Sequence, residues 1–166
     1  MAHLHQSVSF VALISACYLA LASGKHLAFT NCGSAAAKAA FTVSKVVQSP
    51  DNPDIPGAVT VTVEGTALRD IAAGDFEVKV VTKILWFDKT VRHVREKICD
   101  AVAEATTCPI TAGDAAFKYT MKIPLFAPKH KYHVYITAKE DTGGELACIN
   151  TSVDLSNKKV RFTQAT

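Results

Sequence analysis

Alternating apolar and polar residues recur along the chain and predict β-strands. Residues 117–123 (FKYTMKI) change between apolar and polar at every step, and residues 58–64 (AVTVTVE) and 132–139 (YHVYITAK) have apolar residues at every second position. A period of two places one face of a strand against a core and the other face toward water. We therefore expect three amphipathic strands in these segments.

Further strands complete an all-β pattern. The longest candidate covers residues 76–87, and shorter ones cover residues 29–33, 41–47 and 146–155. Turns rich in glycine, proline and aspartate separate them. About seven short strands of this kind predict an immunoglobulin-like antiparallel β-sandwich.

The segments between the strands are expected to be turns and loops. Residues 49–57 (SPDNPDIPG) hold three prolines, which disfavour both helix and sheet pairing. Gly65 interrupts one alternating run at a candidate bulge, and Gly143–Gly144 fits a hairpin turn. Charges crowd residues 88–97, which we expect to form a loop. A short helix is expected at residues 100–105.

Both termini are expected to lie outside the domain. Residues 8–21 are almost entirely apolar, too short to span a bilayer, and followed by small residues. This pattern predicts a secretory signal peptide over residues 1–24, although no Lys or Arg precedes the apolar run. The domain would then cover residues 25–156, with a polar tail at residues 157–166. We expect a protein that is secreted or that reaches an endolysosomal or vacuolar lumen.

The cysteines fit an oxidising compartment. Loss of the leader would remove Cys17 and leave Cys32, Cys99, Cys108 and Cys148. An even number of cysteines in a secreted domain predicts two disulfides, for which the sequence allows three pairings. The spacing of these residues is unlike that of zinc sites.

Neither the charge nor the motifs indicate catalysis or nucleic-acid binding. The formal net charge of +3 is small for a nucleic-acid-binding domain. The chain has no nucleophile elbow, phosphate-binding loop or zinc-protease motif, and its carboxylates are scattered singly. His130 and His133 would project to opposite faces of a strand and so would not bind a metal together. We therefore expect neither an enzyme nor a bound metal or other cofactor.

An ordered set of segments runs from residue 29 to residue 155. The most specific is CPITAG followed by an alternating strand, and the others are FTNCG, SPDNPDIPG, VTVTVEGTA, GDFEVKV, ICD, KYHVYITA and GGELACINTSVDL. This set resembles the MD-2-related lipid-recognition family, or ML domain. Within that family it is most similar to secreted phosphatidylglycerol/phosphatidylinositol transfer proteins. Niemann-Pick type C2 sterol carriers and group 2 mite allergens are more distant relatives.

The resemblance implies a sandwich whose two sheets splay apart at one end and hold a lipid between them. It also implies the disulfides Cys32–Cys148 and Cys99–Cys108, without the further short bridge of six-cysteine relatives. The implied function is a monomeric carrier that moves a phospholipid or a sterol between membranes. Two alternatives remain, namely a lipid-sensing co-receptor and an immunoglobulin-like adhesion or recognition domain with a filled core.

The apolar faces of the predicted strands are the candidate walls of a lipid cavity. In an arbitrary sandwich such faces would fill the core, but the resemblance makes them candidates to line the site. Phe117, Tyr119 and Met121 directly follow the CPI segment and are the first candidates. The full set is Phe76, Val78, Val80, Ile84, Trp86, Phe117, Tyr119, Met121, Ile123, Tyr132, Val134 and Ile136.

Basic residues supply candidate contacts to lipid head groups or to an anionic membrane surface. They are Lys89, Arg92, Arg95 and Lys97, together with the turn at residues 129–131. Ordinary solvated loop charge is the alternative explanation for them. Asn150 begins an Asn-Thr-Ser sequence and is a candidate glycosylation site on a predicted strand.

Overall fold

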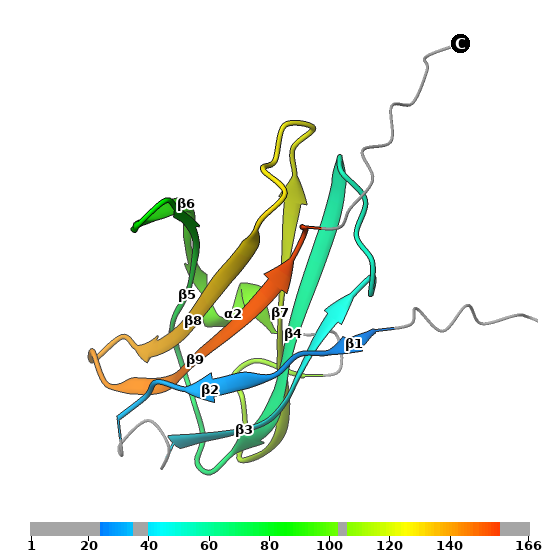
Figure 1. Ribbon diagram of the computed structural model, residues 1–166. Coiled ribbons are helices and arrows are strands. Elements are labelled where there is room, and N and C mark those ends of the chain that lie inside the picture. The colour runs from blue at the N-terminus through cyan, green and yellow to red at the C-terminus, as the bar shows by residue number, and fades with distance from the viewer. Residues whose placement is uncertain (1–23, 35–39, 103–105, 157–166) are drawn as a thin grey trace, which may run out of the picture.

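Two antiparallel β-sheets pack face to face (Figure 1). The computed structural model describes residues 24–34, 40–102 and 106–156. The strands are β1 (Lys25–His26), β2 (Phe29–Asn31), β3 (Phe41–Ser49), β4 (Gly57–Ala67), β5 (Gly74–Ile84), β6 (Phe87–Lys97), β7 (Gly113–Ile123), β8 (Lys131–Glu140) and β9 (Glu145–Asp154). One sheet has the order β1-β3-β4-β7 and the other the order β2-β9-β8-β5-β6. The predicted sandwich is confirmed, with nine strands in the described residues instead of about seven.

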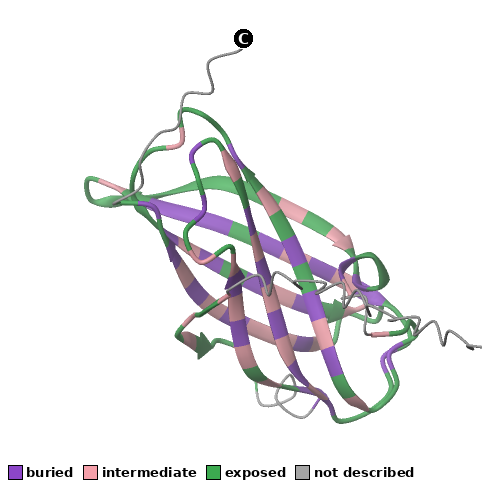
Figure 2. Ribbon diagram, turned by 90° about the vertical axis from the view of Figure 1, so that its right-hand side faces the viewer, coloured by how far each residue is buried: buried purple, intermediate pink, exposed green. Residues whose placement is uncertain are grey.

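The three alternating segments form strands that each bury one face. β4 and β7 pair without a break from Gly57 opposite Ile123 to Ala67 opposite Gly113. Buried residues alternate with more exposed ones along them, as the purple bands on the strands in Figure 2 show. β8 lies between β9 and β5 in the other sheet and buries its inward face in the same way. Packing of these faces against each other forms the core.

The segment from residue 76 to residue 97 is a hairpin, not a long strand and a loop. β5 ends at Ile84, a turn at Leu85 and Trp86 reverses the chain, and β6 pairs antiparallel with β5. Trp86 therefore does not share the inward face of β5, and its side chain is 83% exposed. β6 escaped prediction because it lies at the sheet edge, where most of its side chains are exposed and no apolar alternation is needed.

Three phenylalanine rings fill the space between the sheets at one end, which we call the closed end. The ring of Phe117 packs edge-on against Phe41 with 5.3 Å between centroids and stacks on Phe76 at 5.8 Å. All three side chains are buried. They bring together β3, β5 and β7, so both sheets contribute to this cluster. Aromatic contacts of this geometry stabilise a core beyond the area that they bury.

The short helix also lies at the closed end, after β6. It is α2 (Ile98–Ala101), and it begins two residues before the predicted segment. Ile98 and Ala101 are both buried and hold this turn against the core. Val102 is extended, so the helix has already ended there. Residues 103–105 of the predicted helix lie outside the described residues.

Gly65 does not interrupt its strand. β4 continues through it, and the bulge lies in β3 between Val43 and Lys45. A Cβ atom on Gly65 would come within 2.7 Å of the Phe41 ring and closer still to the Thr42 carbonyl oxygen. The absence of a side chain at this position therefore allows Phe41 to occupy the closed end.

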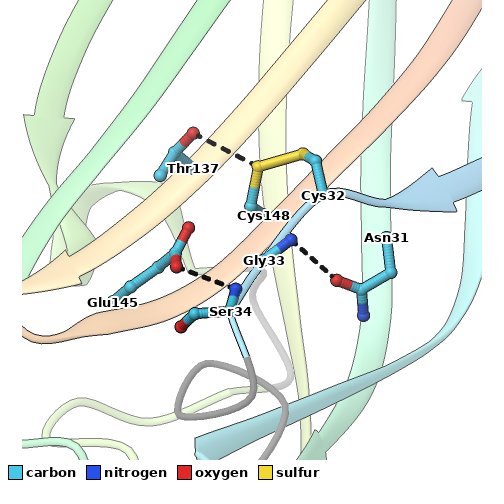
Figure 3. The surroundings of a disulfide bond; sticks show 7 residues. All are labelled: Asn31, Cys32, Gly33, Ser34, Thr137, Glu145 and Cys148. Atoms are coloured by element: carbon cyan, nitrogen blue, oxygen red, sulfur yellow. Dashed lines mark hydrogen bonds between the residues drawn. A yellow bond between two sulfur atoms is a disulfide. The ribbon is translucent and has the colours of Figure 1, made fainter.

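The two implied disulfides are both present. Cys32 is bonded to Cys148, with 5.0 Å between Cα atoms, and Cys99 to Cys108, with 5.6 Å. The first joins the segment after β2 to β9, where the Cys32 N–H also donates to the Cys148 carbonyl oxygen at 2.9 Å. Figure 3 shows this bridge beside Glu145, whose carboxylate accepts a hydrogen bond from the Ser34 N–H at 3.0 Å.

Two sequence predictions fall mainly on undescribed residues. Apart from Gly24, the proposed signal peptide lies outside the described residues, and so does the whole polar tail at residues 157–166. In the part of the chain that the structure does describe, no helix has the length and apolar character needed to cross a membrane.

Candidate functional site

A cavity of about 920 Å³ lies between the two sheets, at the end opposite the phenylalanine rings. It is partly open to solvent, and we call this end of the sandwich the open end. Its walls come from the start of β4 and β8, the end of β7 and β9, and the parts of β5 and β6 nearest their hairpin. Strand ends from both sheets therefore surround it.

Aliphatic side chains form most of the cavity wall. Val59 and Met121 come from the four-stranded sheet, whereas Val80 and Val153 come from the five-stranded sheet. A valine reaches less far from its strand than a phenylalanine. Valines on both walls therefore leave unfilled the space that aromatic rings occupy at the closed end. An apolar cavity of this kind suits a ligand with little hydrogen-bonding capacity.

Two hydroxyl groups at or near the cavity are already hydrogen-bonded within the protein. The Tyr132 hydroxyl donates to the carbonyl oxygen of Pro128 at 2.5 Å, and both residues line the cavity. Burial raises the pKa of Tyr132, so the phenol keeps its proton and remains a donor. The fully buried Thr82 hydroxyl donates to the Lys131 carbonyl oxygen at 3.3 Å. The Thr82 bond fixes the start of β8 against β5, the Tyr132 bond fixes the preceding loop, and both hydroxyls are engaged.

Arg92 brings a positive charge to the cavity wall. It lies on β6 directly opposite Val80 of β5, and both residues line the cavity. Its guanidinium forms no ion pair or hydrogen bond with any residue in the described ranges. The planar fork of N–H donors on a guanidinium matches the oxygens of a phosphate group. Arg92 is therefore the side chain best suited to bind an anionic group at this site.

The predicted wall residues divide into three groups. Val80, Met121, Ile123 and Tyr132 line the cavity. Six others are buried in the packed core outside its wall; they are Phe76, Val78, Phe117, Tyr119, Val134 and Ile136. Ile84 is half-buried and does not line the cavity, and Trp86 lies in the exposed turn that follows it.

Several wall residues were not predicted as such. Val59 belongs to a predicted amphipathic strand, but nothing in its alternation distinguishes a cavity wall from a core. Val153 and Leu155 lie at and just after the end of β9, and Pro124 and Ala127 lie in the loop after β7. These last four residues all lie at or beyond the end of a strand, and the sequence could have indicated such positions.

The four basic candidates on β6 do not lie at one edge of the molecule. Lys89 is near the β5–β6 turn at the open end, whereas Lys97 ends the strand at the closed end, about 26 Å away at roughly 3.3 Å per residue. Arg95 pairs with Asp75 at 2.5 Å, and Lys97 pairs with the same carboxylate at 3.3 Å. The hydrogen bond from Arg95 lowers the pKa of Asp75. Arg95 and Lys97 thus serve ion pairs at the end away from the cavity.

Asn150 lies on the outer face of the five-stranded sheet. It is paired with Thr30 of β2 and with Tyr135 of β8, and it is half-buried between those strands. Its neighbour Thr151 points the other way, is buried, and donates to the Ala28 carbonyl oxygen at 2.8 Å. Glycosylation of Asn150 remains a prediction.

Comparison with known proteins identifies the family. The model of the ML domain matches residues 26–155 of the chain. The chain belongs to the ML domain family. This match contains every described strand except the first residue of β1, so the family covers both sheets and the cavity between them.

Named relatives and a solved structure agree with this assignment. A phosphatidylglycerol/phosphatidylinositol transfer protein from Mycosarcoma maydis is 27% identical over 140 residues, which cover 82% of this chain and 69% of that protein. A putative phosphatidylglycerol/phosphatidylinositol transfer protein 2 from Dictyostelium discoideum is 24% identical over 127 residues, covering 76% and 84%. A crystal structure of a Niemann-Pick type C2 protein from the Japanese carpenter ant has the same fold. It superposes with a TM-score of 0.55 at 15% identity, over 76% of this chain and 98% of that one.

Proposed function

We propose that the protein binds one phospholipid in the cavity at the open end and carries it between membranes without catalysing a reaction. The observation that supports this most directly is the apolar cavity of about 920 Å³ between the sheets. That volume is at the upper end of the roughly 300–1,000 Å³ typical of small-molecule sites. The names of the fungal and Dictyostelium relatives point to the same class of ligand.

The balance of free energies favours a carrier. Burying an acyl chain away from water is worth about 0.8 kcal/mol per CH2 group. A bilayer offers the same chain an equally apolar environment, so transfer from bilayer to cavity is nearly neutral. A protein with these walls can therefore take up a lipid and also release it.

Arg92 favours a phospholipid over a sterol as the ligand. A phosphate can accept two hydrogen bonds from the guanidinium and neutralise its charge, whereas a sterol hydroxyl can do neither to the same extent. Phosphatidylglycerol and phosphatidylinositol are both net anionic, unlike phosphatidylcholine. We expect Arg92 to contribute to a preference for these two head groups.

The two disulfides and the predicted leader support a lumenal or extracellular site of action. Disulfides form and persist in the secretory pathway and outside the cell, and are rare in the cytosol. We propose that the protein acts outside the cell or in an endolysosomal or vacuolar lumen. Detection of the mature chain beginning near residue 25 in culture medium or in a lumenal fraction would test this.

Mass spectrometry of the purified protein tests the function. Native spectra should show one lipid per protein, and an organic extract should contain phospholipid. In the variant Arg92→Gln, the ratio of bound phosphatidylglycerol to bound phosphatidylcholine should fall about fivefold to tenfold, since a charge-assisted hydrogen bond is lost. Arg92→Lys is the matched control, because it keeps the charge and should retain part of the preference.

Two results would contradict the proposal. A protein that carries no lipid and takes up none from vesicles would favour the alternative of a recognition domain with a filled core. A sterol as the only extracted lipid, with Arg92→Gln unchanged in its lipid content, would reject the phospholipid and the role of Arg92.

A further inference from the structure

Large hydrophobic side chains are exposed in a cluster at the open end. Among the described residues, eight large hydrophobic side chains are exposed, and all but Leu68 and Tyr135 lie at this end, five of them at two loop tips and Val91 on β6. These six are Leu85, Trp86, Phe87, Val91, Leu125 and Phe126. Single exposed apolar residues are ordinary, but a group of them beside a cavity marks an interaction surface.

The first part is the tip of the β5–β6 hairpin, formed by Leu85, Trp86 and Phe87. The last strand pair is Ile84 with Phe87, so only two residues form the turn. Leu85 has φ = 58°, in the left-handed region where glycine or asparagine is usual. Bulky apolar residues occupy a turn that ordinarily selects small or polar ones. Packing within the protein does not explain this choice, because Trp86 is 83% exposed.

The second part is the tip of the loop between β7 and β8, formed by Leu125 and Phe126. The Ala127 N–H donates to the Pro124 carbonyl oxygen at 3.0 Å and closes a tight turn around these two residues. Pro124 and Ala127 both line the cavity, whereas Phe126 is 85% exposed. The turn therefore directs Phe126 outward from the rim of the cavity.

Both tips lie at the same end of the sandwich. Thr82 of β5 pairs with Lys89 of β6 on one side and with Tyr132 of β8 on the other. The hairpin tip follows Thr82 by three residues, and the second tip precedes Tyr132. Figure 1 shows both segments on the upper side of the molecule, the hairpin at β6 and the yellow loop above β7. Residues that line the cavity adjoin both tips, with Val91 and Arg92 after the first and Pro124 and Ala127 around the second.

Basic residues flank the two tips. Segments 83–92 and 122–131 together hold six lysine or arginine residues and one acidic residue, Asp88. The third loop at this end, residues 50–56, holds two aspartates and no basic residue. Exposed aromatic side chains between basic ones fit the head-group layer of an anionic bilayer, where a ring is half in and half out of water.

We infer that Leu85–Phe87 and Leu125–Phe126 form a two-part docking surface that inserts into the head-group layer of anionic membranes. Docking there brings the cavity opening to the bilayer, so a lipid passes between the two without crossing water. The passage of a lipid between bilayer and cavity rests on the proposed function, whereas the docking itself does not. Binding to vesicles is measured separately from the lipid content of the cavity.

Trp86 is the single tryptophan of the chain and reports directly on docking. Its emission should shift to shorter wavelength with vesicles of phosphatidylcholine and phosphatidylglycerol, and brominated lipids should quench it. Vesicles of phosphatidylcholine alone should give a smaller change at the same lipid concentration. An emission spectrum unaffected by anionic vesicles overturns the inference. So does a blue shift that grows with protein concentration in the absence of vesicles, since a second copy would then cover the tips.

A pair of variants tests the second tip without altering the reporter. Phe126→Ser should weaken vesicle binding by about tenfold or more, because a large aromatic side chain no longer leaves water. Leu68→Ser is the matched control, since Leu68 is 54% exposed at the closed end and should change binding by less than about twofold. Circular dichroism checks that both variants fold.

The two proposals fail in different ways. Phe126→Ser protein that still carries lipid but binds vesicles like the wild type overturns docking and leaves lipid binding intact. Wild-type protein that docks through Trp86 but never contains lipid overturns the carrier function and leaves docking intact. Equal weakening of vesicle binding by Leu68→Ser and Phe126→Ser also overturns docking at the open end.

Discussion

The two ends of the sandwich are built from the same strands and do different things. At the closed end the rings of Phe41, Phe76 and Phe117 fill the space between the sheets, and both disulfides lie toward that end. At the open end the same sheets surround an empty volume of about 920 Å³. The aromatic contacts and the cross-links are therefore concentrated away from the cavity.

A single strand shows the contrast most clearly. Phe117 and Met121 lie four residues apart on the same face of β7. Phe117 is 3% exposed and contacts two other aromatic rings, whereas Met121 is only partly buried and lines the cavity. Both residues are apolar and face inward, so the side chains that the opposite sheet presents decide which of them packs and which faces a ligand.

The largest expected effect concerns the disulfides. Replacing Cys32 and Cys148 together by serine removes a cross-link between residues 116 positions apart, which the loop-entropy model values at about 5 kcal/mol. The same change at Cys99 and Cys108, nine positions apart, should cost about 3 kcal/mol. Urea unfolding under non-reducing conditions measures both losses. A larger loss from the short bridge would contradict the loop-length explanation.

A smaller effect is expected within β7. Phe117→Ala should destabilise the protein by about 3–5 kcal/mol, because it opens a void in a packed aromatic cluster. Met121→Ala should cost about 1 kcal/mol or less, because the side chain already borders empty space and its removal creates little new cavity. Chemical denaturation of the two variants measures the difference. Equal losses would mean that the open end is packed like the closed end.

For lipid uptake, in contrast to stability, a change at Met121 should have a larger effect than a change at Phe117. Met121→Glu should reduce lipid uptake by about tenfold or more, since a carboxylate on the wall must lose water when an acyl chain enters. Phe117→Leu, the control, keeps an apolar side chain in the core and should leave uptake within about twofold. Uptake from labelled vesicles measures both. Normal uptake by folded Met121→Glu protein would remove this residue from the site.

The smallest expected effect is electrostatic and disappears at acid pH. The hydrogen bond from Arg95 lowers the pKa of Asp75, so the folded state favours the charged carboxylate. The contribution of Asp75 to the free energy of unfolding is fully present above the carboxyl's unfolded pKa. It is lost as pH falls through the lower pKa of the folded state. Asp75→Asn should therefore be less stable than the wild type near neutral pH, and the two should converge in strong acid. Asp88→Asn, at the open end, is the control, and a pH series of thermal melts measures the difference.

Sequence reasoning predicted most strands because burial of one face leaves a period of two in the sequence. It missed β6, because the inward positions of this strand include Arg92 beside the cavity and are not all apolar. The sequence of β6 therefore lacks a regular apolar alternation. It also could not separate cavity walls from core among its twelve candidates, of which Phe76 and Val134 pack in the core. Alternation reports which face of a strand is turned inward, but not whether the opposite sheet supplies a partner. That second fact depends on contacts between residues distant in the sequence.

The position of β6 has a consequence for the behaviour of the protein in solution. It is the last strand of its sheet, and no described strand pairs with its outer side. An edge of eleven residues with free backbone donors and acceptors could template a strand from another molecule. Lys89 and Arg92 lie along this edge and pair with no carboxylate in the described residues, so two such edges that approach each other bring like charges together. These two residues thereby oppose edge-to-edge aggregation, a role that needs no membrane and that Lys89 keeps while the cavity is loaded.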